Sequence, residues 1–245
     1  MGAIYRREMG AFFTSGVGYV FLSVFTLLSG IFFYFGVIGS GRADISPMFS
    51  SMFLVVLFLI PILTMKLFSE EKKNRTDQGL LTAPVSLWSI VLGKYFAALT
   101  LFIIAESVVF IYSLFIAVFG EVMWPSLLGN YAAMLFLGAA FIAIGVFISS
   151  LTENQMAAAV ASMLALFLLY LLDSLAASIN VGSGSELVQK ILGFVQNAMY
   201  SVSFLSRYNG FTQGVFDLSS IVFFVSTAFL FNFFTVRVLE KRRWS

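Results

Sequence analysis

From Leu127 to Ile148 the chain reads LLGNYAAMLFLGAAFIAIGVFI, a run of 22 residues without a charged side chain. A helix needs about 20 mostly apolar residues to cross the hydrocarbon core of a bilayer. The run is apolar throughout and does not alternate between apolar and polar residues, which argues against a strand of a membrane barrel. The stretch therefore predicts a transmembrane helix.

Five further stretches of the 245-residue chain meet the same criterion. The six predicted spans are residues 17–38, 48–65, 95–119, 127–148, 156–172 and 219–236. Together they hold about half of the chain, and the loops between them are short. The sequence therefore predicts an all-α polytopic membrane protein with six transmembrane helices in a single domain, residues 1–245.

The composition supports a membrane protein and excludes several kinds of chemistry. Hydrophobic residues make up 60% of the chain and charged residues only 11%, against roughly 25% in an ordinary soluble protein. The mean hydropathy is +0.98. Because the chain has no cysteine and no histidine, a thiolate zinc site, a Ser-His-Asp triad and a histidine-ligated haem are all excluded. We expect no catalytic residue and no metal site.

The distribution of Lys and Arg predicts the orientation, because short cytoplasmic loops carry an excess of both. With the N-terminus inside, eleven of these residues lie on the cytoplasmic side and three outside. The eleven are Arg6, Arg7, Lys66, Lys72, Lys73, Arg75, Lys94, Arg237, Lys241, Arg242 and Arg243. The three are Arg42, Lys190 and Arg207. We therefore expect both termini in the cytoplasm.

Two segments near the inner surface carry helix signals. In residues 1–13 apolar side chains recur every three or four positions with charged residues between them, which predicts an amphipathic helix at the interface. The alternative for this segment is a frayed tail. In the loop before span five, Thr152 and Gln155 form a T-x-x-Q pair that predicts a capping box.

The loop between spans two and three predicts a further short helix. Thr76 is placed as its N-cap, and Asp77 lies in its first turn, facing the positive end of the helix dipole. Leu80 and Leu81 supply an apolar face, and Pro84 stops the helix. About two turns of helix do not persist alone in water. The helix must therefore fold back on its own membrane domain or dock into a groove of a partner.

Between spans five and six the sequence predicts an amphipathic helix. Ser183 and Glu186 form an S-x-x-E capping box, and apolar residues then recur at helical spacing. They are Leu187, Val188, Ile191, Leu192, Val195, Ala198 and Met199. The helix lies on the outer leaflet, dips back into it, or forms a small cap over the helix ends, and the periodicity leaves these open. Asn209-Gly210 predicts a turn before the last span.

Glu106, in the middle of span three, is the clearest charged residue at membrane depth. It lines a substrate or proton path, or it is a neutral or paired structural residue that bonds to a neighbouring helix. A phosphate-binding loop is absent, since the Gly93-Lys94 pair lacks the glycine required at Trp88. Span four carries a series of small residues, which favour close packing inside one subunit or at a subunit interface.

Several short motifs carry a family resemblance. They are Ile4-Tyr5-Arg6-Arg7-Glu8, Glu70-Glu71-Lys72, Thr76-Asp77, Leu80-Leu81-Thr82-Ala83-Pro84-Val85, Ile90-Val91-Leu92-Gly93-Lys94, residues 149–154 and Gly214-Val215-Phe216-Asp217. Together with the six spans they resemble ABC-2 type transporter permeases over essentially the whole chain. The closest resemblance is to the permease subunit of the gliding-motility-associated ABC transporter.

The resemblance implies a partner and a set of contact residues. The N-terminal helix would be the interfacial elbow of the family, and residues 76–81 the coupling helix that sits in a groove of a separate ATPase subunit. The residues implied for ATPase coupling are Glu70, Glu71, Arg75, Thr76, Asp77, Leu80, Leu81 and Pro84. Those implied for a second cytoplasmic contact are Thr152, Glu153 and Asn154.

The resemblance also implies an assembly. Such permeases work as homodimers or pseudo-dimers in the bacterial inner membrane, and a companion protein with a periplasmic domain associates in the gliding-type branch. ATP and Mg²⁺ would be bound by the ATPase, with no cofactor in this chain and no nucleic-acid partner. The substrate and the direction of transport do not follow from the resemblance.

The resulting expectation is a non-catalytic permease subunit that moves its substrate with energy from a separate ATPase. The alternative is a stand-alone carrier or channel that uses Glu106 as an ion or proton site. Against this alternative, the chain shows no internal repeat and few intramembrane ionisable residues. A membrane enzyme ranks third, because nucleophile–base pairs without His or Cys are rare.

Overall fold

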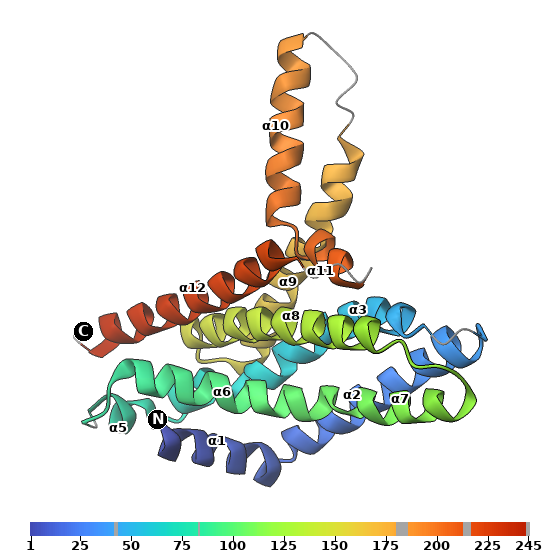
Figure 1. Cartoon of the computed structure of the whole chain (residues 1–245). Helices are drawn as coiled ribbons and strands as arrows, with labels where there is room; N and C mark the ends of the chain where they lie inside the picture. The colour runs from blue at the N-terminus through green and yellow to red at the C-terminus, as the bar shows by residue number, and fades with distance from the viewer. Residues whose placement is uncertain (42–43, 83, 180–185, 213–216, 244–245) are drawn as a thin grey trace.

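The computed structural model describes residues 1–41, 44–82, 84–179, 186–212 and 217–243. Every regular element in this part of the chain is a helix, so the predicted all-α fold is confirmed there (Figure 1). In chain order the elements are α1 (Gly2–Thr14), α2 (Val17–Phe33), the π-helix η1 (Tyr34–Ile38), α3 (Ser46–Thr64), α4 (Lys66–Lys73), α5 (Asp77–Thr82), α6 (Leu87–Glu106), α7 (Val108–Phe119), α8 (Trp124–Leu151), α9 (Gln155–Ser178), α10 (Glu186–Val202), α11 (Phe204–Thr212) and α12 (Leu218–Arg243).

Among the described residues, six helical stretches are long and apolar enough to cross a bilayer, and they correspond to the six predicted spans. They are Val17–Ile38, Ser46–Lys73, Leu87–Val118, Trp124–Leu151, Gln155–Ser178 and Leu218–Arg243. The third begins eight residues before the predicted boundary, and the sixth continues seven residues beyond it. The cause is that hydropathy marks the residues suited to lipid, whereas backbone hydrogen bonding continues into the polar residues that follow.

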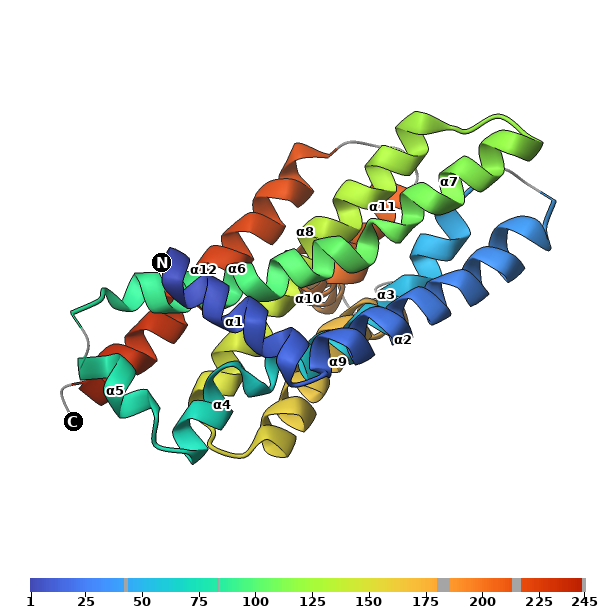
Figure 2. The same cartoon turned by 90° about the horizontal axis from the view of Figure 1, so that it is seen from below.

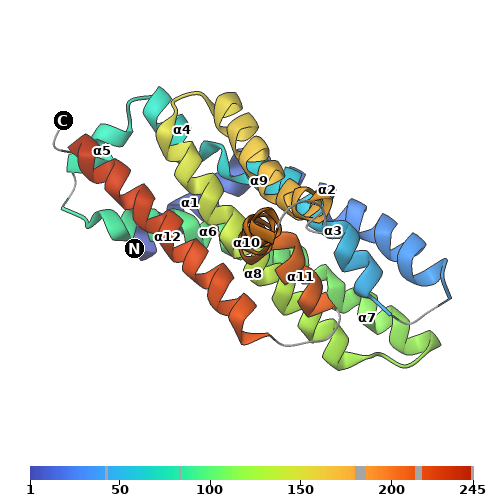
Figure 3. The same cartoon turned by 90° about the horizontal axis from the view of Figure 1, so that it is seen from above.

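The helices form an elongated bundle with two distinct ends. The N-terminus, α5 and the last turn of α12 lie together at one end, here called the α5 end (Figure 1). The C-terminal ends of η1 and α7 lie at the opposite end, the α7 end (Figure 2). The helix α8 lies at the centre and packs along α12, α3 and α6 (Figure 3).

Two glycines allow the close packing of α8. A Cβ atom at Gly138 would overlap the ring of Phe102 on α6, and one at Gly145 would overlap the side chain of Thr64 on α3. Small residues let helices approach closely where apolar packing is the main attraction. Gly138 and Gly145 of the fourth span therefore serve packing inside one chain.

The helices α9 and α10 depart from the bundle. Figure 1 shows α10 and the C-terminal half of α9 standing away from the other helices, and Figure 3 looks along the axis of α10. The amide of Gln196 on α10 donates to the carbonyl of Ala176 on α9 at 2.9 Å. The predicted amphipathic helix is thus present from Glu186 to Val202, while Ser183 of the proposed capping box lies outside the described residues.

The short helix α11 replaces a predicted turn. Asn209 and Gly210 lie inside it, so the turn prediction is wrong. Phe204, Tyr208 and Phe211 are buried at helical spacing, and the hydroxyl of Tyr208 donates to the carbonyl of Phe49 on α3 at 2.9 Å. Burial of this face outweighs the local turn preference of the Asn-Gly pair.

Candidate functional site

The N-terminal helix α1 packs on α6, which confirms the predicted helix and makes the frayed-tail alternative wrong. Ile4 and Phe12 are buried, and the hydroxyl of Tyr5 donates to Thr100 at 3.1 Å. The pattern of residues 1–13, with Glu8 among the charged residues between the apolar ones, predicts an exposed Glu8, but it is buried on the same face as Ile4 and Phe12. The spacing of four residues to each side explains this, because positions i and i+4 share a helix face.

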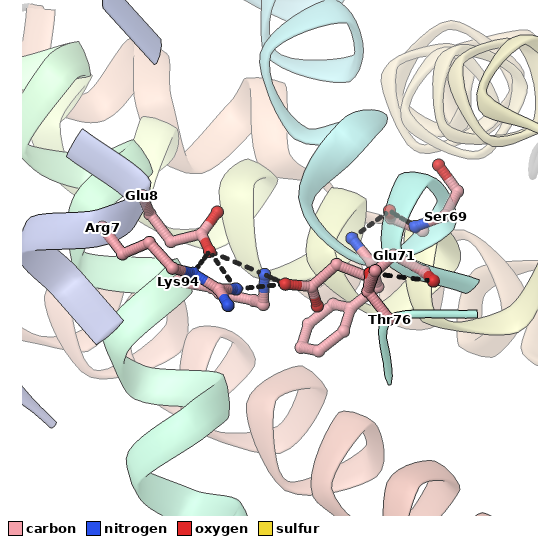
Figure 4. Close-up of polar contacts among 8 residues, drawn as sticks. Arg7, Glu8, Ser69, Glu71, Thr76 and Lys94 are labelled. Atoms are coloured by element: carbon pink, nitrogen blue, oxygen red, sulfur yellow. Dashed lines mark hydrogen bonds and ion pairs between the residues drawn. The ribbon is translucent and has the colours of Figure 1, made fainter. Parts of the chain in front are cut away.

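Glu8 belongs to a cluster of four charged side chains from three helices, here called the four-charge cluster (Figure 4). Lys94 on α6 lies with its Nζ 2.9 Å from Oε1 of Glu8 and 3.0 Å from Oε1 of Glu71 on α4. Arg7 pairs with both carboxylates, at 2.8 Å from Glu8. The cluster joins α1, α4 and α6 at the α5 end.

The charges of the cluster balance, which is the condition for burying them. The side chain of Lys94 is only 1% exposed, whereas that of Arg7 is 53% exposed. Partial burial lowers the pKa of Arg7, but the hydrogen bond to Glu8 and the charge of Glu71 outweigh this and raise it. A buried charge without a partner is strongly destabilising, so each member depends on the others. A cavity of about 390 Å³ adjoins the cluster and is also lined by Lys66, Glu70 and Thr76.

Hydrogen bonds fasten α4 to the last turn of α8. The hydroxyl of Ser149 accepts from the backbone N–H groups of Phe68 and Ser69, at 3.1 and 3.3 Å, and donates to the carbonyl of Met65 at 3.0 Å. The buried Nζ of Lys72 donates to the carbonyl of Ser150. A cation at this place also complements the negative end of the α8 dipole.

The predicted short helix is present as α5, and it packs against α12 and α4 of the same chain. Asp77 at its start accepts from Nη1 of Arg242 on α12 at 3.2 Å. The other Nη atom of Arg242 lies 3.7 Å from Glu153 in the loop between α8 and α9. Arg242 therefore brings α5 and the α8–α9 loop to one surface at the α5 end.

The other residues implied for ATPase coupling lie around α5. Thr76 is exposed and immediately precedes the helix, and its hydroxyl donates to the carbonyl of Glu71 at 3.3 Å. Arg75 has a positive φ of 55°, a left-handed conformation that reverses the chain between α4 and α5. Leu80 is half-buried against the core, and Pro84 is exposed. The side chain of Leu81 lies outside the described part of the chain.

The α8–α9 loop corrects one capping prediction. Helix α9 begins at Gln155 with Asn154 as its N-cap, whose Oδ1 accepts from the N–H groups of Met156 and Ala157 at 2.9 and 3.3 Å. The Thr152–Gln155 capping box is wrong, because the hydroxyl of Thr152 accepts from the N–H of Asn154 instead. Asn is as strong an N-cap as any residue, so it displaces Thr152 from that position. A cavity of about 310 Å³ lies beside this loop, between Lys73 and residues 153–156.

Lys94 and Arg242 are the members of this region whose roles the sequence did not reveal. Lys94 interrupts an apolar run near the start of the third span, and Arg242 is one of three basic residues in the last turn of α12. A lone lysine in an apolar helix is a signal for a buried partner. Its partner Glu8 lies 86 positions away, which no local pattern indicates.

Glu106 is separate from this region. It is fully buried at the boundary between α6 and α7, and both of its carboxylate oxygens lack a hydrogen-bond partner among the described residues. The paired structural alternative requires a hydrogen-bond or ion-pair partner for Glu106, and the described residues supply none.

Six long apolar helices, with charged clusters gathered at one end, define a multi-pass membrane protein. Comparison with protein families identifies the kind of membrane protein. A model described as ABC-2 family transporter protein matches residues 8–239, nearly the whole chain. The chain therefore belongs to the ABC-2 family and is a transporter permease. No curated protein matches it in sequence.

Proposed function

We propose that this chain is the membrane-spanning subunit of an ABC-2 transporter, energised by ATP that a separate ABC ATPase binds with Mg²⁺ and hydrolyses. The ATPase docks at the α5 end, on the surface formed by α5, the α8–α9 loop and the last turn of α12. The observation that carries the proposal is the link from Arg242 to both Asp77 and Glu153. It brings together the two loop regions that the family resemblance implicates in ATPase contact.

The orientation and assembly belong to the same proposal. The excess of Lys and Arg at the α5 end supports a cytoplasmic location of that end and of both termini, with the bundle in a bacterial inner membrane. The chain works as a homodimer or pseudo-dimer. The loop motifs support membership of the gliding-motility-type branch, with a companion protein that has a periplasmic domain.

Gly79 offers a sharp test of the docking surface. It is exposed on α5, and a Cβ atom built there meets no atom within 4 Å. Gly79→Trp therefore adds bulk to the contact face while leaving the packing of this chain intact. We expect it to abolish co-purification of the ATPase from native membranes, together with the ATPase activity of the complex.

Gly10→Trp is the matched control, because Gly10 is an exposed glycine of α1 at the same end with equally open surroundings. It should leave co-purification unchanged. Leu80→Asp should also abolish co-purification while the protein stays inserted, although it additionally removes the contact of Leu80 with the core of this chain. If the ATPase is retained equally by both α5 variants, it does not dock on α5 and the assignment fails.

A stand-alone carrier is the second candidate, and the unpartnered carboxyl of Glu106 is the observation that favours it. Vesicles that contain this chain alone distinguish the two. Gradient-driven flux without an ATPase would establish the carrier, and its absence, with flux restored by the ATPase and ATP, would establish the permease.

A further inference from the structure

Glu106 lies where the third span is interrupted. Helix α6 ends at Glu106 and α7 begins at Val108, with Ser107 between them. The N–H of Phe110 bonds to the carbonyl of Ser107, three residues back, at 3.1 Å, and the Ser107 hydroxyl donates to the carbonyl of Ile104 at 2.6 Å. This is one tightened turn in the middle of a 32-residue helical stretch. The N–H of Ser107 still bonds to the carbonyl of Ile103 at 2.9 Å, so the backbone stays helical on both sides of this turn.

Packing against α8 defines the surroundings of Glu106. Phe102, one turn before it, packs on Gly138, and Phe110, one turn after it, lies with its ring centroid 5.0 Å from that of Tyr131. Glu106 therefore faces α8 between Tyr131 and Gly138. Tyr131 on α8 and Tyr208 on α11 are the titratable side chains near Glu106.

No cation faces Glu106 in the described part of the chain. The lysine on its own helix, Lys94, lies twelve residues away, roughly 18 Å along the axis, and is held by the four-charge cluster. The titratable groups that face Glu106 are the phenols of Tyr131 and Tyr208, and the latter already donates to the carbonyl of Phe49. A carboxylate here would be an uncompensated charge in a medium of low dielectric constant, which is strongly unfavourable.

The hydrogen-bond partners that Glu106 lacks indicate what it binds. Within the residues that the structure describes, Oε1 and Oε2 of Glu106 are buried acceptors without a donor, and so is Oδ1 of Asn130 on α8. The amide nitrogen of Asn130 is already used by the carbonyl of Ser126 at 2.8 Å. A proton on Glu106 removes its charge and turns one of its acceptors into a donor. A metal ion would instead need several oxygen ligands around a cavity.

We propose that Glu106 is an exchangeable proton-binding site of the permease. It binds one proton in the closed bundle described here, and it exchanges that proton with water when the helices around the α6–α7 interruption separate. Only the O–H bond of the carboxyl forms and breaks. The proposal goes beyond the proposed function, and it does not depend on which protein supplies the energy.

Infrared spectroscopy of the purified chain in lipid nanodiscs tests the bound proton. We expect the C=O stretching band of a protonated carboxyl at neutral pH, and its loss in Glu106→Gln, which keeps the size of the side chain. Glu121→Gln is the matched control, because Glu121 is an exposed carboxyl outside the helices, and it should retain the band. Absence of the band from the unmodified chain overturns the proposal.

Exchange distinguishes a proton site from a merely structural acid. The band should shift when the chain is transferred to D2O, and a band that never shifts would mean a locked proton and would overturn the proposal. Dicyclohexylcarbodiimide, which modifies protonated carboxyls in apolar surroundings, provides a second measurement on the unmodified chain. We expect peptide mass spectrometry to locate the adduct on Glu106, with slower labelling as the pH rises. Protection by Na⁺ at constant pH would indicate a metal-ion site and refute the proton assignment.

Discussion

The Nζ atom of Lys94 lies 2.9 Å from the Oε1 atom of Glu8, although 86 positions separate the two residues in the chain. The contact joins the N-terminal helix to the third span, and Glu71 brings in the helix that leads to α5. Because the four charges balance and three of them are largely enclosed, losing a buried member leaves its partners incompletely compensated.

Lys94→Met should therefore destabilise the protein by about 3 kcal/mol, because it leaves Glu8 and Glu71 with Arg7 alone. Thermal unfolding in detergent, followed by size-exclusion chromatography, measures this. Arg237→Met breaks a pair in which the arginine is 60% exposed, and it should change the stability by less than about 1 kcal/mol. Removing Glu8 as well should recover part of the loss, since the double variant no longer buries the same unpaired charge. Equal effects of Lys94→Met and Arg237→Met would contradict the role of the cluster.

Gly145→Ala should destabilise the bundle by about 1–3 kcal/mol, because the added methyl group overlaps Thr64 on α3. Gly138→Ala should act similarly through Phe102. The matched control is Gly210→Ala in α11, where a Cβ atom meets nothing within 4 Å. There the alanine should be neutral or slightly stabilising, because it restricts the unfolded chain. Thermal unfolding of the three variants gives the order, and a neutral Gly145→Ala would show that α8 and α3 can separate freely.

Acid should weaken the start of α12 through Asp217. The hydrogen bond from the Ser220 hydroxyl, at 2.7 Å, and the one from the Ser219 N–H hold the pKa of Asp217 below its ordinary value. A carboxyl whose pKa is lowered in the folded state stabilises the fold at pH values above its unfolded pKa of about 3.9. This contribution to stability is lost as the pH falls below that value towards the lower pKa of the folded state. Melting temperatures of the wild type and Asp217→Asn should therefore converge as the pH is lowered through that range. If the two melting temperatures instead fall in parallel as the pH is lowered, the ionised form of Asp217 does not stabilise the start of α12.

The chain has no cysteine, so single cysteines can report its orientation. Glu121→Cys lies in the exposed connection between α7 and α8, and Arg243→Cys at the exposed end of α12. In intact spheroplasts a membrane-impermeant maleimide should label Glu121→Cys at once, and Arg243→Cys only after permeabilisation. The reverse pattern would invert the proposed topology.

The sequence predicted the number and order of the spans because each must present an apolar surface along its whole length. The ends of the helices were harder to predict from the sequence. Residues 87–94 are helical although Lys94 is charged, because tertiary contacts with Glu8 and Glu71 compensate that charge. Local hydropathy does not indicate such a partner.

Local signals also competed with one another. Thr152 and Asn154 are both good N-caps, and only the backbone geometry decides that Asn154 begins α9. Asn209-Gly210 has the composition of a turn, but it lies inside α11 because Tyr208 and Phe211 are buried against the bundle. In both places the three-dimensional context selected between two locally acceptable conformations.

The bonds from Ser149 to the backbone of α4 have a mechanical consequence. They tie α4 to the last turn of α8, which leads through residues 152–154 into α9, so a displacement of α4 is transmitted to that connection. Helix α9 has 24 residues and is about 36 Å long, and α10 is attached beyond its distant end. A tilt of α9 by only about 5° about its first turn would carry that end through roughly 3 Å. Leverage of this kind turns a slight displacement on one side of a membrane into a substantial one at the other.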